Sequence, residues 1–145
     1  MKLIDTDTIN YILVNKKSFE DECFVTPDVN EEMLVAEMVH SKKVPVSIRQ
    51  LIFGGDFDEA DYLKNYYEAL NQYSKRSFFN MKGFGDVSIV AAAHTIINSK
   101  KSKPSVLPLP GFVDEIEVYT GDTHLSKYLK KKFNGDIKIF NKTDI

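Results

Sequence analysis

Cysteine is almost absent from this chain, which carries a single one, Cys23, among its 145 residues. A lone cysteine excludes an internal disulfide, and it excludes a zinc site built from several thiolates. We interpret Cys23 as a small core residue in a strand. The lack of a disulfide framework is typical of a protein that stays inside the cell.

Long apolar runs are missing as well. No stretch approaches the roughly 18 consecutive apolar residues of a membrane-crossing helix. Near the N-terminus, Asp5 and Asp7 interrupt the apolar segment that a signal peptide would need. We therefore expect a soluble cytoplasmic protein that has no membrane partner.

A strong excess of either charge is the third absence, since the formal net charge is only −2. This balance argues against a purely electrostatic clamp on DNA or RNA. It does not exclude a nuclease, because a bound cation would offset acidic residues in a site. The basic residues that could contact phosphates form two clusters: Lys100, Lys101 and Lys103, and Lys127, Lys130, Lys131 and Lys132.

The chain does contain enough apolar residues, 43%, to bury the core of a single domain covering 1–145. Apolar patterning and turn residues predict strands at 1–4, 23–25, 115–120 and 137–140, and helices at 8–13, 27–40, 58–76, 87–98 and 123–133. Residues 44–53 fit either a strand or a helix, and the basic, proline-rich segment 100–111 is predicted to be a loop. Strands that alternate with helices indicate an α/β fold with a parallel sheet.

Four acidic residues stand at the ends of apolar runs or at the starts of predicted helices. They are Asp5, Glu32, Asp86 and Asp122. A parallel sheet brings its strand ends to one edge, where ligands bind. Carboxylates gathered there would repel one another unless a divalent cation joined them, and oxygen ligands suit Mg²⁺ or Mn²⁺. The pattern predicts a metal-dependent enzyme that acts on phosphate esters.

The segments around these acids resemble the PIN-domain family. Leu-Ile-Asp-Thr-Asp is similar to its first strand and first acid, Asp5, and Thr-Pro-Asp-Val-Asn-Glu-Glu-Met is similar to the segment that supplies Glu32. Asp-Val-Ser-Ile-Val-Ala-Ala-Ala, from Asp86, resembles the family's Asp-x-x-Ile-x-Ala-x-Ala. Val-Tyr-Thr-Gly-Asp, ending at Asp122, resembles its Thr-x-Asp strand end. The four segments occur in the family's order over nearly the entire chain.

The resemblance implies a three-layer α/β/α sandwich and a divalent-metal-dependent endoribonuclease. Many small members are toxins of toxin–antitoxin pairs that act as homodimers, so single-stranded RNA, an antitoxin protein and a second copy are the expected partners. In this interpretation Asp5, Asp86 and Asp122 hold one Mg²⁺ or Mn²⁺, and Glu32 holds a second metal or orients water. Thr120 orients a carboxylate or a bound water.

Two features depart from the family pattern, and at one position the alignment with the family could be shifted by one residue. Asp7 stands where the family more often has Asn or Ser, so it is either an extra acid or, like Thr6, a residue that orients the site. The loop at 100–114 looks longer than usual and could contact substrate or partner. Glu31 is the alternative to Glu32 if the alignment is displaced by one residue.

Each acid also has a purely structural interpretation. Asp5 could simply start a helix, and Glu32 could interact favourably with a helix dipole. Asp86 and Asp122 could be N-caps. The order of all four favours the metal site over these separate explanations.

Two other functions stay open. Asp5-Thr-Asp7 after an apolar strand resembles the nucleophile motif of haloacid-dehalogenase-type phosphatases, although the family's other motifs are not evident. A non-catalytic PIN-like module that binds RNA or a protein is the second alternative. The three histidines have no metal-ligand spacing, and of these His124 is the one close to a candidate acid.

Overall fold

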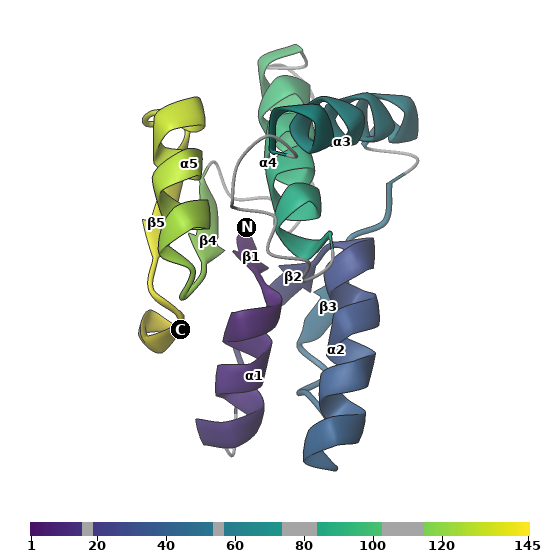
Figure 1. The fold of residues 1–145 in the computed structure, drawn as a ribbon, viewed down its shortest axis with the longest axis vertical. Coiled ribbons are helices and arrows are strands. Elements are labelled where there is room, and N and C mark those ends of the chain that lie inside the picture. Colours follow the sequence, from purple (N-terminus) through teal and green to yellow (C-terminus); the bar gives the residue numbers. More distant parts are fainter. Residues whose placement is uncertain (16–18, 54–56, 74–83, 103–114) are drawn as a thin grey trace.

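A computed structural model describes residues 1–15, 19–53, 57–73, 84–102 and 115–145 of the chain. Within these ranges the fold is α/β, a three-layer α/β/α sandwich with a central parallel sheet (Figure 1). The architecture predicted from the sequence is confirmed.

The central sheet has five strands, all parallel, in the order β3-β2-β1-β4-β5. The strands are β1 (Lys2–Ile4), β2 (Cys23–Val25), β3 (Ile48–Gln50), β4 (Ile116–Tyr119) and β5 (Ile137–Phe140). The first strand therefore lies in the middle of the sheet, between β2 and β4. Because all strands run the same way, their carboxyl ends meet at one edge.

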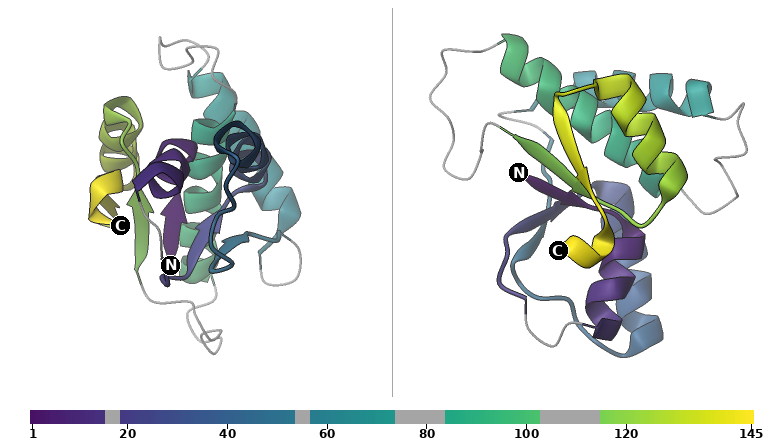
Figure 2. Two further views of the ribbon diagram at one scale, coloured as in Figure 1. Left: turned by 90° about the horizontal axis from the view of Figure 1, so that it is seen from below. Right: turned by 90° about the vertical axis from the view of Figure 1, so that its left-hand side faces the viewer.

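Helices cover both faces of the sheet. They are α1 (Thr6–Asn15), α2 (Pro27–His40), α3 (Glu59–Tyr73), α4 (Gly85–Ser102) and α5 (Thr123–Phe133), followed by a 3₁₀ turn, η1 (Lys142–Asp144). Figure 2 shows the strands running between α1 and α2 on one side and α3, α4 and α5 on the other. The order of the elements explains this, since the chain moves from β1 towards β3 through α1 and α2 and returns to the other half through the remaining helices.

The core forms where the strands meet α4. Leu3 and Ile4 of the central strand are fully buried. On α4 the small residues Ala91, Ala92 and Ala93 are also fully buried, which allows the helix to approach its neighbours closely. A helix that is apolar nearly all round has to be enclosed, and this one fixes the position of its own first turn, where Asp86 lies.

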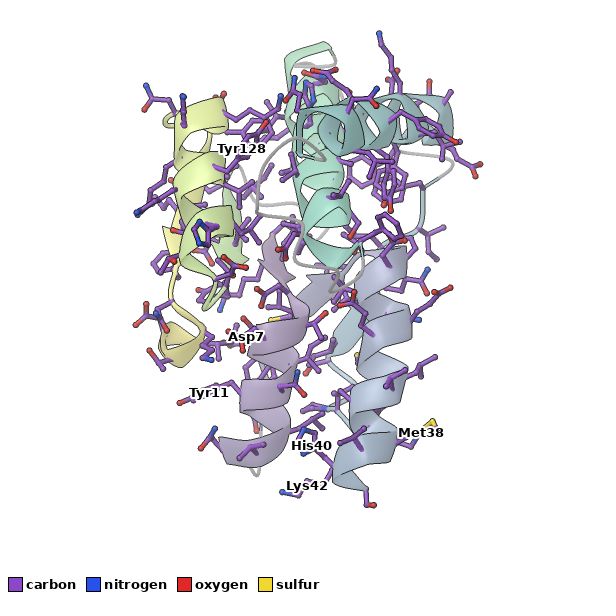
Figure 3. The ribbon with its side chains drawn as sticks, in the orientation of Figure 1. Asp7, Tyr11, Met38, His40, Lys42 and Tyr128 are labelled. Atoms are coloured by element: carbon purple, nitrogen blue, oxygen red, sulfur yellow. The ribbon has the colours of Figure 1, made fainter. Side chains whose placement is uncertain are left out.

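Helix α2 begins and ends at recognisable capping residues. The Thr26 hydroxyl accepts a hydrogen bond from Val29 N–H, and Pro27 occupies the first helical position. The helix ends at Ser41, which has left-handed backbone angles. Its last turn is tied to α1 by His40, whose Nε2 lies 3.1 Å from Asn10 Oδ1, in the region labelled in Figure 3.

Two segments of the structure refine the sequence-based prediction. The ambiguous region 44–53 contains a strand of three residues, Ile48–Gln50. The predicted loop is wrong at its start, because α4 continues through Lys100 to Ser102. Pro104 follows closely, and a helix usually ends at or before the residue that precedes a proline. The rest of that predicted loop lies outside the described residues.

Among the helices in the described ranges, none is both long enough and apolar enough to cross a membrane.

A candidate metal site of four carboxylates

The pairing of β1 with β4 brings the first two site residues together. In the register of these strands Ile4 lies opposite Tyr119, so the next residues, Asp5 and Thr120, leave the sheet at the same edge. The Thr120 hydroxyl donates a hydrogen bond to Asp5 Oδ2 at 2.5 Å. The same hydroxyl oxygen accepts one from Asp122 N–H at 2.9 Å. Thr120 therefore links two of the four predicted acids.

Asp5 is nearly inaccessible to solvent, with 3% of its surface exposed. Its Oδ1 accepts a hydrogen bond from Thr8 N–H at 2.8 Å, so it also caps the start of α1. Burial raises the pKa of Asp5 to about 6, although the hydrogen bonds from Thr120 and Thr8 oppose this rise by stabilising the charged form. Asp5 therefore does start a helix, as its structural interpretation has it, and it also lies beside Thr120 in the candidate site.

Asp122 has a similar double position. It is the N-cap of α5, and its Oδ1 accepts hydrogen bonds from His124 N–H and Leu125 N–H. These bonds fix the carboxylate at the end of β4. The second carboxylate oxygen is left for interactions across the site.

Glu32 enters the site from the second turn of α2. It accepts a hydrogen bond from the Thr6 hydroxyl at the start of α1 and another from the Gly85 backbone at the start of α4. Burial raises the pKa of Glu32 above its ordinary value, and these two bonds oppose the rise. Glu31, the alternative position, is exposed on the same helix. Of the two neighbours, the structure places Glu32 beside the other acids.

Asp86, in the first turn of α4, lies within electrostatic reach of the other three acids. Its pKa is raised to about 7, first by burial and then by the negative charges of Asp122, Asp5 and Glu32, in that order of importance. A hydrogen bond between the Asp86 and Asp122 side chains acts in the same direction. A carboxyl and a carboxylate that share a proton in this way relieve part of their mutual repulsion. The four predicted acids thus form one interacting group.

The four carboxylates lack ion-pair partners among the described residues, in contrast with Asp7. Lys142, in η1, donates to both carboxylate oxygens of Asp7 at 3.0 Å. This pair packs over Gly121, between Thr120 and Asp122. Figure 3 shows Asp7 on the side of α1 that faces the C-terminal segment. Asp7 is therefore a neighbour of the acidic group whose charge is already balanced.

The chemistry of the group fits a divalent cation, because carboxylate oxygens are its preferred ligands and no lysine or arginine of the described chain neutralises them. The oxygens do not yet surround a common point, however. Within the described ranges, no three Asp, Glu, His or Cys side chains stand in an arrangement that could hold a metal ion. The hydrogen bonds already described explain this, since Thr6, Thr8 and Thr120 each draw a carboxylate oxygen towards themselves. Binding a cation would require small rotations of these side chains.

Sequence reasoning did not find two residues that shape the site. One is Gly85, whose backbone contacts Glu32; its position directly before Asp86 was the available signal. Lys142 gave no signal at all, because 134 residues separate it from Asp7 along the chain and no local pattern joins them.

Comparison of the chain with protein-family models, with curated proteins and with solved structures gives no match in any of the three. The function is therefore inferred from the site residues and their chemistry.

Proposed function

We propose that the protein is a divalent-metal-dependent endoribonuclease with a PIN-like acidic site. The observation that carries the proposal is the interaction of Asp86 with Asp122, Asp5 and Glu32, which come from the end of β4, the end of β1 and the second turn of α2. The three-layer α/β/α fold agrees with the architecture that the sequence resemblance implies. A structural protein gains nothing from a largely buried carboxyl such as Asp86, whose pKa three neighbouring acids raise, because this arrangement costs stability.

In this proposal Asp5, Asp86 and Asp122 would hold Mg²⁺ or Mn²⁺, and Glu32 would hold a second ion or orient water. A bound ion of this kind supplies charge neutralisation at a phosphate and an activated water. Thr120 acts as a positioning residue, because its hydroxyl holds Asp5 and the Asp122 backbone in register. Thr6 does the same for Glu32.

The phosphatase alternative receives less support from the geometry. It needs Asp5 as a nucleophile and Asp7 as a nearby proton donor. Both oxygens of Asp5 accept hydrogen bonds, and Asp7 is held by Lys142. A toxin role, with an antitoxin protein as partner and a homodimer as the active form, is part of the proposal through the sequence resemblance alone.

Labelled single-stranded RNA incubated in Mn²⁺, Mg²⁺ or EDTA tests the proposal. We expect cleavage that requires metal, that is lost in Asp86→Asn and that is retained in Asp61→Asn, an exposed acid in the first turn of α3. Glu32→Gln and Glu31→Gln form a second matched pair on α2. Equal cleavage by Asp86→Asn and the unchanged chain would overturn the assignment, and cleavage of a small phosphomonoester but not RNA would favour the phosphatase.

A further inference from the structure

A cavity of about 340 Å³ opens between α5 and the end of β5. Thr120 and Asp122 are among its lining residues, so the cavity adjoins the acidic group at Asp122. Lys127, Lys130 and Phe140 also line it. Its volume lies at the lower end of the range of about 300 to 1,000 Å³ that is typical of small-ligand sites.

The charge of the cavity wall differs from that of the acidic group. Lys127 and Lys130 are three residues apart on α5 and therefore lie on the same side of the helix. Both side chains are exposed, and neither forms an ion pair or hydrogen bond with another described residue. Lys132 on the same helix, by contrast, lies 3.8 Å from Glu68. Two uncompensated ammonium groups on a cavity wall provide a site for a phosphate.

Among the described residues, Asp122 is the one acid that lines this cavity, and one of its oxygens accepts hydrogen bonds from the amides of α5. The rest of the described lining is positive or neutral. A phosphodiester chain that approaches the acidic group needs cations to offset its own charge. Lys127 and Lys130 supply two, five and eight residues after Asp122 along the chain.

We propose that this cavity binds the nucleotide adjacent to the scissile phosphate of single-stranded RNA. Lys127 and Lys130 contact its phosphate. The inference rests on the proposed function, because the acidic group defines where the scissile phosphate lies. It assigns the RNA-binding surface to α5 and β5, and so predicts which lysines of the basic cluster take part.

A labelled ten-nucleotide oligouridylate, measured by fluorescence anisotropy in EDTA, tests binding without metal. We expect Lys127→Gln with Lys130→Gln to weaken binding several-fold and to reduce the dependence of log K on log salt concentration by about 1.4, if each lysine contacts one phosphate. The control is Lys64→Gln with Lys131→Gln, which removes the same charge from exposed positions outside the cavity lining. Equal weakening by the two double variants would overturn the proposal.

Cleavage of the same RNA in Mn²⁺ distinguishes this inference from the proposed function. Cleavage that is lost in Asp86→Asn and insensitive to the Lys127 and Lys130 substitutions would overturn the cavity assignment and leave the nuclease intact. RNA binding that depends on these lysines, without cleavage by the unchanged chain in any metal, would overturn the nuclease and support the cavity as an RNA site.

Discussion

The carboxylate of Glu32 lies directly against the α-carbon of Gly85. A methyl group built on Gly85 would stand 2.9 Å from Glu32 Oε2 and 3.1 Å from Oε1, both closer than ordinary contact allows. Glycine at this position therefore keeps α2 and α4 close enough for Glu32 to reach the acidic group.

Gly85→Ala should consequently abolish or strongly reduce RNA cleavage while the protein remains folded. Alanine favours a helix by up to about 1 kcal/mol over glycine, so the free energy of unfolding should change little. Cleavage rates and urea unfolding measure the two effects. If the variant acts by displacing Glu32, adding it to Glu32→Gln should cause no further loss. Independent, additive losses would contradict this explanation.

The raised pKa of Asp86 predicts how stability depends on pH in EDTA. The unfolded chain releases this proton near pH 4, whereas the folded protein holds it to about pH 7. Between these values the unfolded state binds fewer protons, so this residue lowers the free energy of unfolding as pH rises, by at most about 1.4 kcal/mol per pH unit. Its stabilising effect is full below pH 4 and lost above pH 7.

Asp86→Asn removes this titration. We expect the variant to gain stability relative to the unchanged chain as pH rises from 5 to 7.5, measured by urea unfolding in EDTA. Asp61→Asn, at an exposed position, should follow the unchanged chain. Parallel pH curves for Asp86→Asn and the unchanged chain would contradict the raised pKa of this carboxyl.

Thr120→Val tests the link between Asp5 and Asp122. Loss of the hydroxyl removes a hydrogen bond that lowers the pKa of Asp5, so this pKa should rise above about 6. If charged Asp5 is required, the acidic limb of the pH–rate profile should move to higher pH. The orphaned Asp122 N–H should also cost about 1 to 3 kcal/mol of stability. Thr120→Ser should restore the profile, and an unchanged profile in Thr120→Val would contradict the positioning role.

Asp5→Asn and Asp7→Asn should differ sharply although a single residue, Thr6, separates them. Asp5 is buried within the acidic group, whereas Asp7 is partly exposed and paired with Lys142. We expect Asp5→Asn to abolish cleavage and Asp7→Asn to retain most of it. A partly exposed ion pair contributes about 0 to 1 kcal/mol, so stability should change little in Asp7→Asn. Equal loss of cleavage in the two variants would make Asp7 a member of the site.

The sequence predicts much of this fold because local signals and tertiary structure agree. The helix Thr123–Phe133 and the strand Ile137–Phe140 have the predicted bounds. The strand Ile48–Gln50 could not be distinguished from a helix, since it has three residues and only Ile48 is buried, too few to show alternation. The end of α4 was placed too early, because lysines near a helix C-terminus stabilise it instead of ending it.

The candidate site was predictable only in part. Because a parallel sheet brings its strand ends to one edge, the sequence can predict that acids at those ends lie close together. The structure brings Asp5, Glu32, Asp86 and Asp122 into one interacting group. Contacts that depend on the exact approach of two elements could not be derived in this way. The proximity of Gly85 to Glu32 is one such contact. The metal-binding role of the four acids stays a prediction.

The position of β1 in the centre of the sheet has a consequence for the growing chain. Lys2, Leu3 and Ile4 pair with residues 117–119, so one edge of the first strand stays unpaired until β4 has been synthesised. Domains fold as units during synthesis, and such distant pairings form late. A nascent chain or a truncated fragment ending before β4 thus contains Asp5 without Thr120 or Asp122. If the protein cleaves RNA, that activity cannot begin before β4 and Asp122 have been synthesised.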